Sequence, residues 1–189
     1  MKLDFDDVKI ADQGCGKLRH LKFFCRIFKS IYLIETDFQL TRLQRLFGKN
    51  NTNIREFLVN FKPEGIETRL YSAKEFRTTK LNLDIIFNIC VFDVEIPDTR
   101  KELAEVSYRN LKKGGLFVLI VPRNISSIMK RCKSYNKHLD GFYFNHHGIT
   151  TFYRNFASSN SIINDLSSLG YYLITDLSTR GYICLIFKK

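Results

Sequence analysis

The stretch Val8-Lys9-Ile10-Ala11-Asp12-Gln13-Gly14-Cys15-Gly16 decides the fold of this chain. A short apolar run leads to an acidic residue and then to two glycines separated by one residue. A segment with apolar residues at helical spacing follows directly. Glycine takes a positive φ at little cost and leaves room for a ligand beside the main chain. The pattern therefore predicts a strand, a tight turn open to a ligand, and a helix.

A second apolar run, Ile31–Ile34, ends in Glu35. In nucleotide-binding α/β folds, an acidic residue at this point accepts hydrogen bonds from ribose hydroxyls. Dinucleotide sites prefer a third glycine three residues after the second, where this chain has Arg19. Asp12, just before the glycines, would repel a pyrophosphate. The pattern fits a nucleoside with a cationic amino-acid end, and a glycine turn of an unrelated α/β protein is the alternative.

Strand-like and helix-like segments alternate along the chain, which predicts an α/β fold with a mainly parallel sheet. We expect strands at 8–12, 31–34, 68–71, 83–92, 116–121, 171–177 and 182–187. We expect helices at 18–28, 40–47, 54–61, 97–111 and 159–169. The link between the last two strands has hairpin length, so this pair should be antiparallel. The length suits a single domain, 1–189, with an insertion at about 123–156 between the fifth and sixth strands.

Composition narrows the class of protein. No apolar run approaches the roughly 18 residues of a membrane span, and the acidic start of the chain does not resemble a secretory signal. Five cysteines without Cys-x-x-Cys spacing give no zinc or redox motif and predict a reducing, cytoplasmic setting. The net charge of +11 favours an anionic partner, most often nucleic acid. Since the basic residues are scattered, a basic surface that is only solvated is an equal alternative.

The first glycine turn resembles motif I of the class I S-adenosylmethionine-dependent methyltransferases, in which an acidic residue, any residue, Gly, any residue and Gly follow one another. Here these positions are held by Asp12, Gly14 and Gly16. The closing antiparallel hairpin is also typical of that family. The resemblance implies a class I fold, a seven-stranded, mainly parallel Rossmann-like sheet with an antiparallel last strand and helices on both faces.

Two later segments are similar to motifs IV and V of the same family. The run Leu83–Asn88 is followed by Ile96-Pro97-Asp98, and then by Leu111-Lys112-Lys113-Gly114-Gly115-Leu116. In the family, a strand that begins with Asp delivers a polar residue to the cofactor, and an Ile-Pro pair leads into a helix. Lys113 stands where the family usually has Pro. The order and spacing of the three matches extend the resemblance over residues 8 to 188.

The resemblance implies S-adenosyl-L-methionine as cofactor and S-adenosyl-L-homocysteine as product. It implies that the glycine turn lines the methionine portion, that Asp12 faces its amino group and that Glu35 binds the ribose. Ser72 matches the place where the family, often with Asp, meets the adenine. The cofactor-binding residues implied are Asp12, Gly14, Cys15, Gly16, Glu35, Ser72, Ala73 and Asn88.

Methyl transfer needs aligned reactants and, for a protonated acceptor, a base. The matched positions imply Asn88, Asp93 and Glu95 as catalytic candidates, since the family often keeps an acidic residue or His after the fourth strand. Structural alternatives exist: Asn88 is a hydrogen-bonded strand end and the two carboxylates are helix N-terminal charges. The chain has neither an Asp/Asn-Pro-Pro-Tyr/Phe motif nor a Pro-Cys pair. This argues against base-flipping amino-methylation and cytosine C5 chemistry.

The insertion interleaves basic and aromatic residues, a combination that suits single-stranded nucleic acid. The family also builds acceptor specificity in this region. The substrate-binding candidates are Lys130, Arg131, Lys133, Tyr135, His147 and Tyr153. The alternative is that the aromatic residues pack a small core and the lysines form its wet side. No third ligand accompanies the adjacent histidines at 146 and 147, so no metal is expected.

Three hypotheses follow from these observations. The leading one is an S-adenosylmethionine-dependent methyltransferase that acts on RNA or DNA. The second is a noncatalytic member of the same fold that serves as a binding or scaffold subunit. The third is an NAD-dependent oxidoreductase, which Arg19 and the terminal hairpin disfavour. The insertion, a partner subunit or a second copy would cover the cofactor site, and no membrane association is expected.

Overall fold

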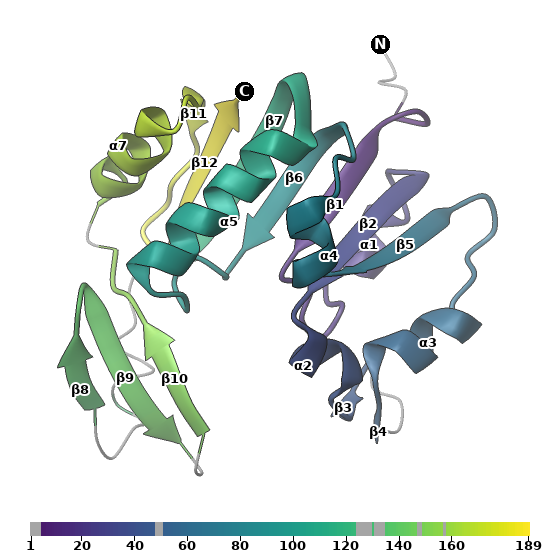
Figure 1. The fold of residues 1–189 in the computed structure, drawn as a ribbon, viewed down its shortest axis with the longest axis horizontal. Helices are drawn as coiled ribbons and strands as arrows, with labels where there is room; N and C mark the ends of the chain where they lie inside the picture. Colours follow the sequence, from purple (N-terminus) through teal and green to yellow (C-terminus); the bar gives the residue numbers. More distant parts are fainter. Residues whose placement is uncertain (1–4, 48–50, 124–129, 131–134, 147–148, 157) are drawn as a thin grey trace. The chain divides into compact units, whose positions relative to one another are not determined.

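A computed structural model describes residues 5–47, 51–123, 130, 135–146, 149–156 and 158–189. Seven strands form one sheet in the order β11-β12-β7-β6-β1-β2-β5 (Figure 1). These strands are β1 (Lys9–Gln13), β2 (Ser30–Glu35), β5 (Glu67–Ser72), β6 (Leu83–Ile89), β7 (Leu111–Pro122), β11 (Tyr172–Asp176) and β12 (Tyr182–Lys188). β1, β2 and β5 are parallel, and β12 is antiparallel to both β7 and β11. The predicted seven-stranded sheet with an antiparallel last strand is confirmed.

The chain divides into two compact units, and the first comprises residues 1–87 and 110–115. It contains β1, β2 and β5 together with α1 (Leu21–Phe24), α2 (Asp37–Thr41), α3 (Ile54–Asn60), α4 (Ala73–Thr78) and the short pair β3 (Gln44–Arg45) and β4 (Asn51–Thr52). β2 is apolar from Ile31 to Ile34 and buried there, as expected of a central parallel strand covered on both faces, whereas the edge strand β5 is more polar and less buried. Ile10 of β1 and both Ile31 and Leu33 of β2 are fully buried, and Phe76 of α4 is 1% exposed.

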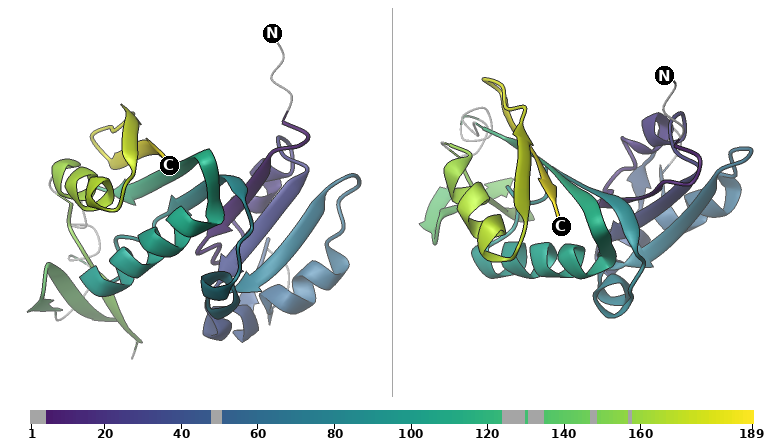
Figure 2. Two further views of the ribbon diagram at one scale, coloured as in Figure 1. Left: turned by 45° about the horizontal axis from the view of Figure 1, so that its top comes forward. Right: turned by 90° about the horizontal axis from the view of Figure 1, so that it is seen from above.

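The second unit comprises residues 88–109 and 116–189. Most of α5 (Pro97–Asn110) and all of α7 (Asn160–Ser168) cover the same face of its strands β7, β12 and β11 (Figure 2). Alternate residues of β7, namely Phe117, Leu119 and Val121, are fully buried under these helices. The buried Tyr171 donates its hydroxyl to the carbonyl of Ala104 at 2.8 Å, which satisfies a polar group inside this core.

The insertion forms a separate antiparallel sheet of three strands, in the order β10-β9-β8. Its strands are β8 (Tyr135–His138), β9 (Gly141–His146) and β10 (Ile149–Tyr153). Phe144, Phe152 and Phe156 are buried, and Phe144 and Phe152 lie on opposite faces of this sheet, so aromatic side chains are packed on both faces. The sequence analysis did not predict these strands.

Two predicted helices differ from the structure. The helix expected at 40–47 is wrong, because α2 ends at Thr41 and residues 44–45 form strand β3. The helix expected at 18–28 is reduced to α1, because Leu18 has a φ of 57° and turns flank the helix on both sides. Leu21, Phe24 and Phe28 are nevertheless buried, so the apolar spacing marked the buried face correctly. The expectation of a single domain stays a prediction.

Candidate functional site

The glycine turn closes directly over the end of β2. The amides of Gly14 and Cys15 both donate to the carbonyl of Ile34, at 2.8 and 3.1 Å. Gly14 has a φ of 77° and Gly16 a φ of 49°, values that favour glycine. A side chain placed at Gly16 would meet only the Gly14 carbonyl, at 3.8 Å. Gly16 is thus required by its backbone conformation, and the space above it is open.

Glu35 ties the end of β2 to this turn. Its Oε2 accepts a hydrogen bond from the Gly16 amide and its Oε1 accepts one from the Thr36 amide, both at 2.8 Å. Burial raises the pKa of Glu35, and these two amides oppose the shift. Each carboxylate oxygen has a second lone pair, so both oxygens can accept a further bond. The predicted ribose-binding residue is therefore held in one orientation before any ligand arrives.

Asp12 is the most unusual group of the first unit. It is 1% exposed, and within the described residues neither of its carboxylate oxygens accepts a hydrogen bond. Among the described residues, the imidazole of His20 is the basic group that meets Asp12: its Nδ1 lies 3.7 Å from Asp12 Oδ2, beyond hydrogen-bond distance. A buried carboxylate without hydrogen bonds is costly, so its place in a fold calls for a compensating cation.

Ser72 lies next to Glu35 in the register of β2 and β5. It is the N-cap of α4: its hydroxyl accepts from the Glu75 amide at 3.1 Å, while Glu75 Oε2 accepts from the Ser72 amide at 2.7 Å. This reciprocal pair is a capping box. The Ser72 amide and one lone pair of its hydroxyl are thus engaged in the cap of α4, and the hydroxyl proton remains able to donate. Ala73 follows as the first residue of the helix and is half-buried.

The register of the strands gathers the predicted cofactor residues of the first unit. Gln13 is opposite Ile34, so the glycine turn begins where Glu35 ends its strand, and Glu35 is opposite Ser72. Asp12, Gly14, Cys15, Gly16, Glu35, Ser72 and Ala73 all belong to this one edge. Asn88, the remaining predicted cofactor residue, is fully buried in β6 and belongs to the second unit.

The loop after β6 carries the predicted acidic residues. Asp93 is 3% exposed, and within the described part of the chain its Oδ1 accepts no hydrogen bond. Burial raises its pKa to about 6. A carboxylate with such a pKa is mostly ionised at neutral pH and accepts a proton readily, as a general base must. Glu95 is half-buried, and its carbonyl accepts a bond from Arg100 Nη1 at 2.9 Å.

An ionic cluster joins the insertion to the helices of the second unit. Asp140, in the turn between β8 and β9, binds both Arg100 of α5 and Arg154, the latter at 3.0 Å between Oδ2 and Nη1. Arg154 Nη2 also bonds to Ser161 Oγ at 3.2 Å, and the Arg154 amide donates to the Asp93 carbonyl at 2.7 Å. The insertion is therefore fastened to the loop that carries the candidate base.

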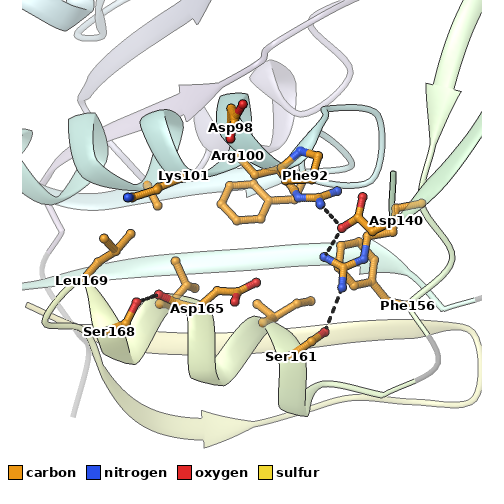
Figure 3. A pocket seen from close by; sticks show the side chains of 15 residues that line it. Phe92, Asp98, Arg100, Lys101, Asp140, Phe156, Ser161, Asp165, Ser168 and Leu169 are labelled. Carbon is orange, nitrogen blue, oxygen red and sulfur yellow. Dashed lines mark hydrogen bonds and ion pairs between the residues drawn. The ribbon is translucent and has the colours of Figure 1, made fainter. Parts of the chain in front are cut away.

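A pocket of about 480 Å³ opens beside this cluster, between α5 and α7 (Figure 3). Figure 3 shows Arg100 and Asp140 at one end, with Phe156 next to Asp140. The guanidinium carbon of Arg154 lies 4.3 Å from the ring centroid of Phe156, a cation–π contact. Burial lowers the pKa of Arg100, and the nearby Arg154 adds to the shift. Lys101 and Asp165 line the rest of the pocket.

The predicted substrate residues are placed only in part. Lys130 and Tyr135 are exposed, and Tyr153 is half-buried with its ring 5.6 Å from that of Phe144. Arg131, Lys133 and His147 lie outside the described residues. On the small sheet, the ring of Tyr135 meets Phe142 edge to face and Phe144 at a tilt, with 5.7 Å between the ring centroids in each case.

Sequence reasoning missed two features. One is His20 beside Asp12, which no motif marks. The other is the Arg100–Asp140–Arg154 cluster, whose members are far apart in the chain and meet only through tertiary structure. Among the described residues, no group of three potential ligands is placed to hold a metal ion. No helix in the described part of the chain has the length and apolar character of a membrane span.

The sequence matches no protein-family profile and no curated protein sequence. Its structure resembles a Methanosarcina mazei S-adenosylmethionine-dependent methyltransferase, at 17% identity and a TM-score of 0.68 over 99% of this chain and 94% of that one. It also resembles the Burkholderia thailandensis 1,6-didemethyltoxoflavin-N1-methyltransferase, solved with its substrate and S-adenosylhomocysteine, at 11% identity and a TM-score of 0.63 over 97% and 72%. A third similar structure is a Haloferax volcanii methyltransferase in complex with the Trm112 methyltransferase activator, at 10% identity and a TM-score of 0.61 over 100% and 84%. At these identities, the likeness establishes the class I methyltransferase fold.

Proposed function

We propose that this chain is an S-adenosylmethionine-dependent methyltransferase. The observation that carries the proposal is Asp12, a buried carboxylate without hydrogen bonds next to a preformed glycine turn and the carboxylate of Glu35. Such an arrangement suits a nucleoside that carries an ammonium group, because the ammonium compensates a desolvated carboxylate. The chain's fold and its neighbours with bound S-adenosylhomocysteine agree with this choice of cofactor.

The roles divide along the edge of the sheet. Asp12 binds the ammonium group, and the backbone of Gly14–Gly16 lines the methionine portion. Glu35 accepts bonds from the ribose hydroxyls with the lone pairs that the amides of Gly16 and Thr36 leave free. Since the amide of Ser72 and one lone pair of its hydroxyl are used in capping α4, contact with the adenine falls mainly to the apolar surface around Ala73.

The bound cofactor supplies an activated methyl group, so the protein has mainly to align the acceptor and exclude water. Asn88 is fully buried at the end of β6 and orients the reacting groups. Asp93 takes a proton from an acceptor that carries one, since its pKa of about 6 leaves it ionised at pH 7. Glu95 is the second acidic candidate in this loop, and its carbonyl already anchors Arg100.

Nucleic acid is the acceptor we propose. The net charge of +11 and the exposed Lys130 and Tyr135 support it, because a basic surface with accessible aromatic rings binds a phosphate backbone and stacked bases. Arg131, Lys133, His147 and Tyr153 extend this candidate surface in the sequence. The Burkholderia neighbour acts on a small molecule, which makes a small-molecule acceptor the natural competitor. A cytoplasmic setting agrees with Cys15, Cys25 and Cys184, which form no disulfide in the described part of the chain.

The cofactor assignment is tested by calorimetry with S-adenosylhomocysteine and with NAD. We expect binding of S-adenosylhomocysteine alone, and a loss of at least about tenfold in affinity for Glu35→Ala, because a charged hydrogen bond contributes about 1.5–3 kcal/mol. Glu64→Ala, an exposed glutamate in a loop of the same unit, is the matched control and should bind as the unaltered chain does. Equal affinity of the two variants would contradict the role of Glu35.

The second candidate is a noncatalytic subunit of the same fold. The short helix α1 and the use of Ser72 as the cap of α4 favour it. The Haloferax neighbour, solved with an activator subunit, makes a partner protein a related possibility. Transfer of labelled methyl groups to total RNA, DNA, protein and a small-molecule extract separates the two candidates. Transfer to RNA or DNA supports the proposed enzyme, and transfer to the small-molecule extract alone supports the competing acceptor. Cofactor binding without transfer to any of the four supports the noncatalytic subunit.

A further inference from the structure

Asp12 is incompletely neutralised in the cofactor-free protein. Asp12 is 1% exposed, and in the described part of the chain neither of its carboxylate oxygens accepts a hydrogen bond. The imidazole of His20 meets it, with Nδ1 3.7 Å from Oδ2. This distance permits an ion pair and is too long for a hydrogen bond. The imidazole of His20 can therefore supply a positive charge to Asp12 without a hydrogen bond of fixed geometry. A group that donates a hydrogen bond to Asp12 can replace it.

The backbone after the glycines holds His20 at this place. Leu18 is fully buried and has a φ of 57°, a conformation rarely taken by a residue with a side chain. Its amide donates to the Cys15 carbonyl at 2.8 Å, so the chain turns back before α1 begins. His20 is the residue before that helix, and its ring lies 6.1 Å from the ring of Phe24. Its side chain is 39% exposed, which leaves the imidazole in contact with water.

We propose that His20 is a positioning residue that occupies the place of the cofactor's ammonium group at Asp12, and that cofactor binding expels its proton. The inference rests on the proposed function. In the free protein, the carboxylate of Asp12 faces the imidazolium of His20. When the ammonium arrives, two cations would share one buried carboxylate, so the N–H proton of the imidazolium passes to water and His20 becomes neutral. No other bond forms or breaks.

The charges around His20 agree with this exchange. Its pKa is raised, chiefly by the interaction with Asp12, while burial and the neighbouring Arg19 oppose the shift. Asp12 from β1 and Arg19 from the turn are the charged groups that act on His20 in the described structure. An ammonium at Asp12 removes the stabilisation that Asp12 gives to the imidazolium. The effects of burial and of Arg19 remain, and both favour the neutral form of His20. Cofactor binding therefore lowers the pKa of His20, and affinity rises with pH until His20 is neutral in the free protein.

The test is calorimetric titration with S-adenosylhomocysteine from about pH 5.5 to about pH 8, in buffers that differ in ionisation enthalpy. We expect release of about one proton per bound ligand at the acidic end, and affinity that rises by up to about tenfold per pH unit there. His20→Gln should bind with little proton release and a flatter pH profile. His138→Gln, an exposed histidine of β8 beside Tyr143, is the matched control and should retain both effects.

Binding that releases no proton, or equal release by His20→Gln and the unaltered protein, would overturn the inference and leave the proposed function standing. A second measurement needs no cofactor. The pKa of His20, followed by nuclear magnetic resonance, should fall in Asp12→Asn, because the carboxylate that stabilises the imidazolium is gone. An unchanged His20 pKa in that variant would contradict the exchange. If S-adenosylhomocysteine fails to bind at every pH, the proposed function is wrong, whatever the resonance experiment gives.

Discussion

The edge of the first unit and the insertion of the second unit are built in opposite ways. At the first edge, the contacts are local or join two adjacent strands: Ser72 caps its own helix α4, and the turn of Gly14 and Gly16 bonds to the end of the neighbouring strand β2. The insertion is fixed by Arg100, Asp140 and Arg154, which come from separate segments. The first edge thus takes its shape from one helix cap and two adjacent strands, whereas the insertion depends on contacts between segments that are distant in the sequence.

The largest effect should come from Gly141→Ala, at the start of β9. A Cβ at this position would lie 2.4 Å from Phe152 Cζ and 2.5 Å from the Tyr153 carbonyl oxygen. Since the carbonyl belongs to the backbone, the clash cannot be relieved by a rotamer change, and we expect a loss of about 3 kcal/mol in the free energy of unfolding. Urea unfolding measures it. Gly181→Ala, with nothing within 4 Å of the added atom, is the control. Equal stability of the two variants would show that the insertion tolerates repacking, and would contradict the view that close contacts between its strands fix it.

The next effect is that of Asp140→Asn, which removes the negative charge that two arginines share. Arg100 is 6% exposed and would be left with its charge uncompensated. Removal of one partner of a buried pair costs about 3–5 kcal/mol, and because Asp140 is 31% exposed we expect about 2 kcal/mol. Asp98→Asn is the control, since Asp98 is an exposed acidic residue beside the same pocket. Thermal unfolding at low and high salt measures the change in stability. A loss of stability no greater than that of Asp98→Asn would argue against the view that the ionic cluster holds the insertion in place.

Asp93→Asn should stabilise the protein while it impairs a proton-accepting reaction. The pKa of Asp93 rises from 3.8 to about 6 in the fold. The stability that follows from this shift is therefore fully present below pH 3.8 and is lost as the pH rises through about 6. At pH 7 to 8 the variant should be more stable by up to about 3 kcal/mol, and below pH 3.8 the difference should vanish. Unfolding free energies across this range measure it, and a pH-independent difference would contradict the buried carboxylate.

The smallest effect concerns the cap at the first edge. Ser72→Ala removes the hydroxyl that accepts from the Glu75 amide and should cost about 1 kcal/mol. Ser168→Ala, in the last turn of α7, is the control: its hydroxyl donates to the Asp165 carbonyl and caps no amide. If Ser72→Ala weakens binding of S-adenosylhomocysteine as strongly as Glu35→Ala, Ser72 contacts the ligand, and its role as a cap alone is wrong.

Much of the fold could be predicted because its signals are short in sequence. The apolar strands, the glycine turn and the terminal hairpin each depend on neighbouring residues, so the positions of the strands and the antiparallel last pair could be predicted. The order of the strands in the sheet did not follow from these signals. The helix expected at 40–47 failed because its apolar residues also suit an extended chain. Leu40 and Leu46 are both fully buried, one in α2 and one after β3.

In the candidate site, too, some residues could be predicted from the sequence and others could not. Asp12, Glu35 and the glycines follow from motif spacing, because each stands at the end of a strand. His20 could not be predicted, since its position depends on the left-handed conformation of Leu18, which the sequence does not mark. The Arg100–Asp140–Arg154 cluster joins two separate segments of the insertion to helix α5, and no pattern in the sequence pairs these residues.

The bond from the Gly16 amide to Glu35 has a kinetic consequence. Because the turn already holds its shape without a ligand, association loses little conformational entropy and needs no slow rearrangement of the loop. Stopped-flow mixing should therefore give a single phase whose rate rises linearly with ligand concentration. Selectivity among related nucleosides would then reside in how long each stays bound.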